Sequence, residues 1–494
     1  MSINLSRNTR LFVSTVDKVT ADTYTNLTPS NTFEVPILTG YGISQAATTS
    51  NITLDEAGDA PIRGQKIFNT ALDPADISFS TYIRPFIDSN DVNNHNCLER
   101  VLWEALVGEG DQTALTTNPF LNTTLSTTSF LADFENSNVH ELLKLQLFFL
   151  VDNTVYKIED VAINSATIDF AIDAISQINW AGFGITLAEY TNGSFVAADA
   201  GSRYKGVPTI NPDFIKNKLS TLVFKNNNTA GVAEGYFPIT YTSALATTAA
   251  SGYTTSTTYD ATITVDGGSP QTINVTGAAN KTVNDVLIDI NNQLDGANAT
   301  LSSDGLTLTV TSLSSGSTST IAITDGATNA LLADLGSAAN GTLGTASAGT
   351  GTPTIYNIPI TSGTITIDNG VTFLTPDELA KVNTPIGSFT GTRAISGSLG
   401  AYLKTGTVDT GGLLATLVSD TNRVTQDYEV EIVAGGSANT PRASFLLPHA
   451  HLVIPAVDVQ DVVSTTIDFT GLGQDIEVSD ELFVEYTAAT SVAY

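Results

Sequence analysis

Two histidines, His449 and His451, are the side chains whose types and spacing best suit a metal ion. The surrounding segment "PHAHLVIP" reads as a β-strand, on which alternate residues share a face. A zinc site needs three or four ligands, and the sequence offers no third ligand at a matching spacing. We therefore expect no metal site at this pair.

Other residue groupings typical of enzymes are incomplete as well. The 50 Asp and Glu residues contain no motif that isolates a carboxylate pair of the glycosidase kind. The segments "GYGIS" and "GSLGAY" lack the Lys-Ser/Thr sequence of a phosphate-binding loop, and a Gly-x-Ser-x-Gly elbow is absent. The Asp-Gly sequences at 266–268 and 304–305 are typical of hairpin turns. We expect a protein that is not an enzyme, with no catalytic or cofactor-binding residues and no cofactor.

The charge balance limits the partners. The chain has 20 basic and 50 acidic residues, a net charge of −30, which argues against adhesion to nucleic acid or to an anionic membrane.

Cys97 is the single cysteine, so no disulfide can form within the chain. No stretch approaches the roughly 18 apolar residues of a membrane span, and the N-terminus lacks the apolar core of a signal peptide. We expect a soluble protein with no membrane partner.

The elements that must position any functional side chain are mostly β-strands. The chain is rich in Thr, Val and Ile, which are typical of β-strands, and in Gly and Asn, which are typical of turns. One amphipathic helix is predicted over 96–108, with Asn96 as its cap and Gly108 at its end. A short helix is predicted over 375–382, capped by Thr375, and 139–150 fits either a helix or a strand. We therefore expect a mainly β fold with one packed helix.

Several strands have one apolar face and one face of small polar or acidic residues. In "ATIDFAIDAISQINWAG", Ile168, Phe170 and Ile172 alternate with Asp169 and Asp173. The polar faces are too small and polar to form a core. They suit either plain solvent or the smooth wall of a channel.

The amino-acid composition changes in the middle of the chain. Polar Gly/Ser/Thr segments on either side read as flexible linkers, and between them lies a compact α+β segment at about 258–336 with a helix near 283–294. The similar segments "YFPIT" (236–240) and "YNIPIT" (356–361) lie at the outer edges of the two linkers. We interpret 229–355 as a domain inserted into a discontinuous host domain of 1–228 and 356–494.

The host sequence resembles the major tail (tail tube) proteins of tailed bacteriophages. The resemblance rests on ordered blocks such as "RGQKIFNTALDPADISFSTYIRPF", "NCLERVLWEALVG", "TIDNGVTFLTPDELAKVNTPIGSFTGTRAISGSLGAYLK" and "PRASFLLPHAHLVIP". It implies a β-sandwich or split-barrel fold and homohexameric rings that stack through loops and the N-terminal region into a hollow tube. It also implies other tail proteins at the tube ends, assembly in the host cytoplasm, and DNA that passes through the lumen without tight binding.

A conduit for DNA should avoid cations on its wall, because Lys and Arg would hold the phosphate backbone. On this hypothesis the lumen candidates are Asp169, Asp173, Thr392, Ser396, Ser398 and Asp468. The alternative is that these faces form the outer wall.

The middle segment separately resembles the small domains inserted in flagellins and hook-associated proteins, through the hairpin "TVDGGSPQTINV" and the helix "LIDINNQL". Its charged residues are mostly acidic: Asp260, Asp266, Asp285, Asp289, Asp295, Asp304, Asp325 and Asp334, against Lys281. We expect it to project outward, where it contacts either the host surface or nothing. An outward domain on each subunit favours a long non-contractile tail, because a contractile sheath would need the same space.

Two other classes compete with this interpretation. An extracellular adhesin or surface-layer protein would share the composition, but it explains the ordered host blocks poorly. A carbohydrate-active enzyme would need aromatic platforms, and Trp103 and Trp180 both read as core residues.

Overall fold

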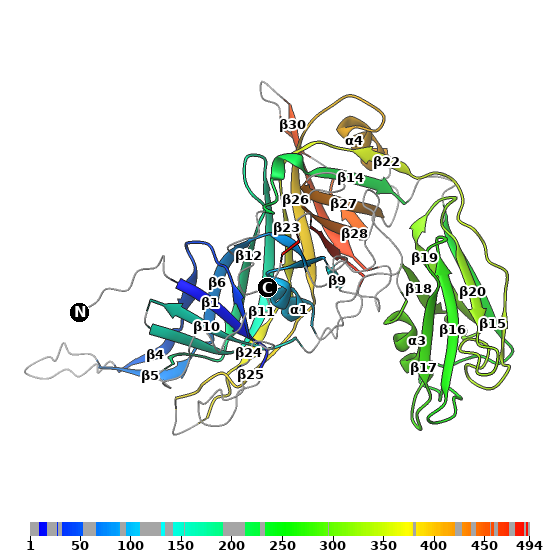
Figure 1. Cartoon of the computed structure of the whole chain (residues 1–494), viewed down its shortest axis with the longest axis horizontal. Helices are drawn as coiled ribbons and strands as arrows, with labels where there is room; N and C mark the ends of the chain where they lie inside the picture. Colours follow the sequence, from blue (N-terminus) through cyan, green and yellow to red (C-terminus); the bar gives the residue numbers. More distant parts are fainter. Residues whose placement is uncertain are drawn as a thin grey trace, which may run out of the picture.

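Antiparallel β-strands dominate the structure, which is a computed structural model (Figure 1). The residues that it describes are 9–16, 27, 32–52, 66–88, 95–108, 130–133, 142–152, 154–190, 213–227, 233–294, 296–378, 382–419, 427–435, 441–454, 456–458, 463–473, 480–488 and 491–492. The predicted mainly β class is confirmed, and the described strands form no closed barrel. Within the same residues, no helix is long and apolar enough to cross a membrane.

The first part of the chain forms a β-sheet unit that we call the first unit. Its main strands are β1 (Thr9–Ser14), β2 (Thr32–Val35), β3 (Gly42–Ser44), β6 (Ala75–Tyr82), β10 (Leu145–Val151), β11 (Thr154–Ala171), β12 (Gln177–Gly184) and β13 (Thr186–Glu189). Strand β1 pairs with β2 and β10, β11 with β10, β12 and β13, and β6 with β3 and β12.

A later part of the chain, the second unit, repeats this arrangement. Its strands are β14 (Thr221–Asn226), β22 (Thr354–Asn357), β23 (Ile360–Asp368), β26 (Ala394–Tyr402), β27 (Tyr428–Gly435), β28 (Arg442–Leu452), β30 (Ser464–Leu472) and β31 (Phe483–Thr487). Strand β14 pairs with β22 and β27, β28 with β27, β30 and β31, and β26 with β23 and β30. Each of the ladders above has its counterpart here, in the same order along the chain. The same β-sheet topology therefore occurs twice in one chain.

One ladder joins the two units into a continuous sheet. Strand β11 pairs with β23, with Ser165 opposite Asp368 and Ala171 opposite Ser362. Strands β6, β12, β11, β23, β26 and β30 thus lie side by side in that order. One face of this sheet is buried, through side chains that include Phe79, Trp180, Ile168, Ile365, Leu399 and Ile467. The alternation predicted from the sequence therefore places one face of each strand in the core.

Helix α1 (Arg100–Val107) lies in the core between the two units. Trp103 packs edge-on against Trp180, with 5.2 Å between ring centroids, and its Nε1 donates a 2.8 Å hydrogen bond to the Tyr486 hydroxyl of β31. The predicted packed helix is therefore confirmed, but its predicted start at Asn96 is wrong: the cap is Glu99. Asn96 instead lies in strand β8 (His95–Cys97), which pairs with β7 (Pro85–Asp88).

Glu99 is a fully buried carboxyl group at the start of this helix. Burial raises its pKa to about 7, although hydrogen bonding to its own backbone N–H and to Tyr486, and the positive charge of Arg84, oppose the shift. The folded state therefore binds a proton that the unfolded state releases near pH 4.5. The associated stability is complete below that pH and is lost as the pH rises through 7.

Replacing Glu99 by Gln is expected to stabilise the protein at alkaline pH, because Gln carries no charge to bury. A pKa shift of this size corresponds to roughly 3 kcal/mol, so we expect the free energy of unfolding to rise by roughly 1–3 kcal/mol near pH 8 and by little near pH 5. Urea unfolding at the two pH values measures this difference. Glu104→Gln, on the partly exposed side of the same helix, serves as the control. An equal change at both pH values would contradict the prediction.

The middle of the chain has its own hydrophobic core. One sheet contains β15 (Glu234–Tyr241), β18 (Ala297–Leu301), β19 (Thr307–Ser315) and β21 (Gly341–Leu343), and a second contains β16 (Thr258–Val265), β17 (Gln271–Thr276) and β20 (Ile321–Asp325). The buried residues include Leu245 and Tyr253, which lie in a segment that we expected to be a flexible linker. The ring of Tyr253 stacks on that of Tyr259 at 4.0 Å. The linker-like composition therefore belongs to packed chain.

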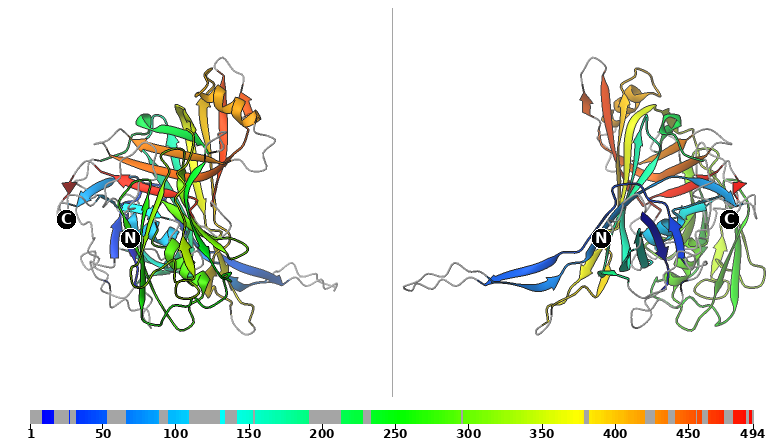
Figure 2. Two further views of the ribbon diagram at one scale, coloured as in Figure 1. Left: turned by 90° about the vertical axis from the view of Figure 1, so that its right-hand side faces the viewer. Right: turned by 60° about the vertical axis from the view of Figure 1, so that its left-hand side comes forward.

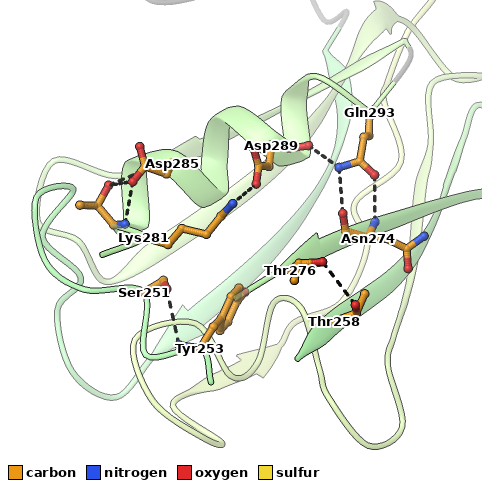
Figure 3. A network of polar contacts seen from close by, with 10 residues as sticks. Ser251, Tyr253, Thr258, Asn274, Thr276, Lys281, Asp285, Asp289 and Gln293 are labelled. Carbon is orange, nitrogen blue, oxygen red and sulfur yellow. Dashed lines mark hydrogen bonds and ion pairs between the residues drawn. The ribbon is translucent and has the colours of Figure 1, made fainter. Parts of the chain in front are cut away.

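Helix α3 (Val283–Asn291) covers part of this core and confirms the helix predicted near 283–294. The Thr282 hydroxyl accepts the Asp285 N–H, and the Asp285 carboxylate accepts the Thr282 N–H, which caps the helix start. Lys281 pairs with Asp289 on the exposed side. After the helix, the Gln293 amide bonds to both the N–H and the carbonyl of Asn274 in β17 (Figure 3). Gln293 thus covers backbone groups that an edge strand would otherwise expose.

The two similar segments at 236–240 and 356–361 belong to different cores. Tyr236 lies in β15, which pairs with β19 and β21, whereas Tyr356 lies in β22, which pairs with β14. The chain enters and leaves the middle region side by side, since Ala233 and Thr350 exchange two 3.0 Å backbone hydrogen bonds. The middle region therefore interrupts the β14–β22 connection, whose counterpart in the first unit is the connection between β1 and β2.

The remaining helix predictions had mixed outcomes. Residues 375–378 of the predicted 375–382 helix are not helical, and 379–381 lie outside the described residues. The ambiguous segment 139–150 contains strand β10 rather than a helix. Helix α4 (Thr410–Ser419) was not predicted, because Gly411 and Gly412 near its start are typical of turns.

Candidate functional site: a polar sheet face with two open edges

The second face of the continuous sheet is polar from one edge to the other. Its side chains come from all six strands and are Ser80, Gln177, Asn179, Thr167, Asp169, Thr364, Thr366, Ser396, Ser398, Thr466, Asp468 and Thr470. None of these is a Lys or an Arg. We call this set the polar face.

The strand register aligns the polar face in rows. Asp169 lies opposite Thr364, Thr364 opposite Ser398, and Ser398 opposite Asp468. Asn179 donates a 2.6 Å hydrogen bond to Asp169 and accepts one of 2.6 Å from Ser80. The rows border an open depression whose lining includes Asp169, Thr364 and Ser398. Asp169 and Asp468 give the polar face negative charge.

The structure places four of the six predicted lumen residues on the polar face. These are Asp169, Ser396, Ser398 and Asp468. Asp173 lies in the exposed turn between β11 and β12, and Thr392 lies in the exposed connection that precedes β26. The second unit also contributes Thr364 and Thr366, whose strand we did not single out from the sequence.

The registers of the two units match at this sheet, except for a bulge between Ile163 and Ser165 that the second unit lacks. In the first unit Ala166 lies opposite Trp180, and in the second Leu452 lies opposite Phe469. Two residues further on, Ile168 and Ile454 are therefore counterparts. On the other side, Ile43 lies opposite Ile77 as Ile367 lies opposite Ile395.

Corresponding residues of the two units differ in solvent exposure at the edge of the sheet. Ile168 is fully buried, with β23 paired alongside it, whereas Ile454 is 43% exposed and its neighbour Val453 is 49% exposed. Among the described strands, none pairs with the outer edge at Val453 and Ile454, and β3 at the opposite end pairs with β6 alone. Within the described residues the sheet therefore has two open edges, and at the edge of the second unit Ile454 is exposed whereas its counterpart Ile168 is buried.

Two hairpin arms extend from the same side of the molecule (Figure 2). They are β4 (Ala47–Ile52) with β5 (Lys66–Leu72), and β24 (Thr372–Leu374) with β25 (Gly387–Phe389). The first arm follows β3 and the second follows β23, so they are counterparts. The Leu72 N–H donates to the Asn383 carbonyl at 2.7 Å and joins the arms. Their exposed apolar residues are Ile67, Phe68, Leu374, Val382, Ile386 and Phe389.

The histidine pair does not form a metal site in the described part of the chain. His449 is buried and its Nδ1 lies 3.0 Å from Asp427, whereas His451 is exposed. No group of three His, Cys, Asp or Glu residues within the described ranges could hold a metal ion. Trp103 and Trp180 are fully buried core residues, as predicted.

Together, these features define a mainly β protein built on a duplicated sheet with one polar face, two open edges and two hairpin arms. No protein-family model matches the chain. The chain is similar to tail tube protein pb6 of Escherichia phage T5, with 26% identity over 491 residues that cover 99% of this chain and 76% of the relative. The chain is therefore a homologue of a phage tail tube protein, which confirms the resemblance predicted from the sequence and places it in the virion tail.

Proposed function

We propose that this chain builds the wall of a hollow tail tube and that its polar face lines the lumen. The observation that carries the proposal is the polar face itself, which continues across both units without a Lys or Arg. Carboxylates and small hydroxyls leave the phosphate backbone of passing DNA hydrated, whereas cations would bind it by releasing counterions. On this proposal the protein acts as a structural conduit for the genome and catalyses no reaction.

Rings would close through the two open edges. Within one chain, Ala166 of the first unit lies opposite Ile367 of the second. Their counterparts are Leu452 and Ile43, so Leu452 of one chain would lie opposite Ile43 of the next. This pairing would cover Val453 and Ile454 and satisfy both edges. Because each chain supplies two units, a ring of six units would contain three chains, in place of the six chains expected from the sequence.

The arms and the inserted region would face other parts of the tail. We propose that the exposed apolar residues of the two arms contact the next ring and stack rings into a tube, with other tail proteins at its ends. Residues 229–355 would form an inserted domain that projects outward from the host domain of 1–228 and 356–494. Such a projection favours a long non-contractile tail, because it would occupy the space of a sheath.

Electron microscopy and mass measurement of the purified protein test this function. We expect rings with an open centre, each with the mass of three chains, and tubes formed from them at high concentration. Disruption of the rings by charged substitutions at Ile43 would support closure through the edges. Monomers without rings over the whole concentration range would contradict the proposal.

A further inference from the structure

Helix α3 packs against two strands that lie at the edges of the sheets in the inserted region. Among the described strands, β17 pairs only with β16, and β18 pairs only with β19. The outer side of an edge strand carries N–H and C=O groups with which a strand of another molecule can pair. These two edges are therefore places where copies of the chain could join.

Gln293 covers the edge of β17. The Asn274 N–H donates a 3.0 Å hydrogen bond to Gln293 Oε1, and Gln293 Nε2 donates one of 3.1 Å to the Asn274 carbonyl (Figure 3). Nε2 also donates to the Asp289 carbonyl of α3 at 2.8 Å, which holds the amide in this orientation. The backbone groups of Asp260, opposite Asn274, bond on the side away from β17. Those of Asn274 therefore point outward, into the position that another strand would take.

Asn291, the last residue of α3, covers the edge of β18 in the same way. The Ala299 N–H donates a 2.8 Å hydrogen bond to Asn291 Oδ1, and Asn291 Nδ2 donates one of 3.2 Å to the Ala299 carbonyl. A side-chain amide carries a donor and an acceptor side by side, as the backbone does. Each of the two amides therefore makes the pair of hydrogen bonds that a residue of a neighbouring antiparallel strand would make.

The remaining edges of the two sheets have other features that oppose pairing. Strand β21 has three residues, and a short edge strand offers little to a partner. Strand β20 ends in Asp325, which shares the inner side of the strand with the buried Ile321. The Asp325 carboxylate accepts the N–H groups of Leu332 and Ala333, and an inward-pointing charge disfavours the addition of a further strand. Each edge of the two described sheets therefore has a feature that opposes pairing.

We propose that Asn291 and Gln293 block the edges of β17 and β18 and so keep the inserted regions of different chains from joining into one sheet. The partner that they exclude is a second copy of this chain, because every copy carries the same two edges. The block is a property of the single chain and does not depend on the proposed tube.

Substitution of the two amides by Ala in the full chain tests the block. All variants carry Ile43→Lys, so that the proposed ring closure does not contribute to the measured mass. Gln293→Ala opens β17 alone, and we expect closed dimers with about twice the mass of the single chain, because identical edges pair through a two-fold axis. Adding Asn291→Ala opens β18 as well, so we expect larger, open-ended species. Sedimentation velocity over a dilution series gives the masses.

Hydrogen exchange at the Asn274 and Ala299 N–H groups locates the pairing. Both groups should exchange slowly in the protein with its amides intact, at every concentration. In the Asn291→Ala/Gln293→Ala variant they should exchange quickly in dilute solution and slowly in concentrated solution, because only pairing between chains then protects them.

Asn284→Ala combined with Asn292→Ala is the matched control. It removes two exposed amides of the same segment that make no hydrogen bond to the described residues of β17 or β18, and it should remain a single chain. Circular dichroism confirms that each variant is folded. If the Ala pair does not fold, Asn291→Leu combined with Gln293→Met removes the amides with less change in side-chain size, and we expect the same association.

A folded variant without the two amides could instead remain a single chain at every concentration. If the exchange at Asn274 and Ala299 were then also independent of concentration, the two amides would only stabilise the inserted region, and the proposed block would not exist. Equal association of the Asn284→Ala/Asn292→Ala control would also overturn the proposal.

Discussion

Oxidation of chains that carry Ser44→Cys and His451→Cys is expected to yield covalent species that end at a closed trimer. The two residues are the counterparts of Asp368 and Ser165, which lie opposite each other where β23 joins β11. Residues opposite each other in an antiparallel pair have Cα atoms roughly 4.5–5.5 Å apart, which suits a disulfide. Both residues are exposed in the single chain, and Cys97 is buried, so the new cysteines should react selectively. Denaturing electrophoresis and mass spectrometry resolve the products.

Three controls bracket this experiment. Each single variant should remain uncrosslinked, and the Ser165→Cys/Asp368→Cys variant should form its disulfide within one chain. Ser44→Cys combined with Thr470→Cys keeps both cysteines in one row of the sheet but separates them by strand β28, because Thr470 lies opposite His451 on the far side of that strand, so it should not crosslink. A ladder that continues to six chains would favour the hexamer of chains expected from the sequence, and the absence of crosslinks would remove the proposed edge pairing.

The sequence predicted the class of fold because its signal is local. Alternation of apolar and small polar residues was enough to identify strands and their buried faces, as at Ile168 and Phe170. The duplication was not visible, because matching positions fill the core differently. Trp180 packs opposite Phe79, whereas its counterpart Phe469 lies opposite Gly397, where a Cβ would come within 2.2 Å of the Phe469 ring. Core volume can be conserved while the side chains that fill it change.

The polar face could be predicted only in part, because it depends on contacts between strands that are distant in the sequence. Alternation shows which residues of a strand share a face, but not which strands lie side by side. The ladder between β11 and β23 joins residues roughly 200 positions apart in the chain, and it brings Thr364 next to Asp169. Asp173 and Thr392 lie just beyond the ends of β11 and β26, where alternation along a strand no longer determines which face a side chain takes.

Positive charge on the polar face is expected to convert a passive lumen into a DNA-binding one. We propose Ser396→Lys combined with Asp468→Lys, two exposed positions on the paired strands β26 and β30 of the second unit. Because the lysines repeat in every chain of a ring, we expect short duplex DNA to bind assembled tubes at least tenfold more tightly than unmodified tubes at about 50 mM salt. The affinity should fall steeply with added salt, with a slope of about 0.9 for each phosphate contacted. Fluorescence anisotropy of labelled duplex, measured over a salt series, gives both quantities.

The matched variant carries Thr324→Lys and Asp304→Lys on the exposed surface of the inserted region. It changes the net charge of the chain by the same amount, so it corrects for general attraction between DNA and a less acidic protein. Binding of a duplex joined to a bulky particle distinguishes the two surfaces. Such a duplex can reach the inserted region but cannot enter a closed lumen. If the particle-linked duplex binds the Ser396→Lys/Asp468→Lys tubes as well as the free duplex does, the polar face lies on the outer wall.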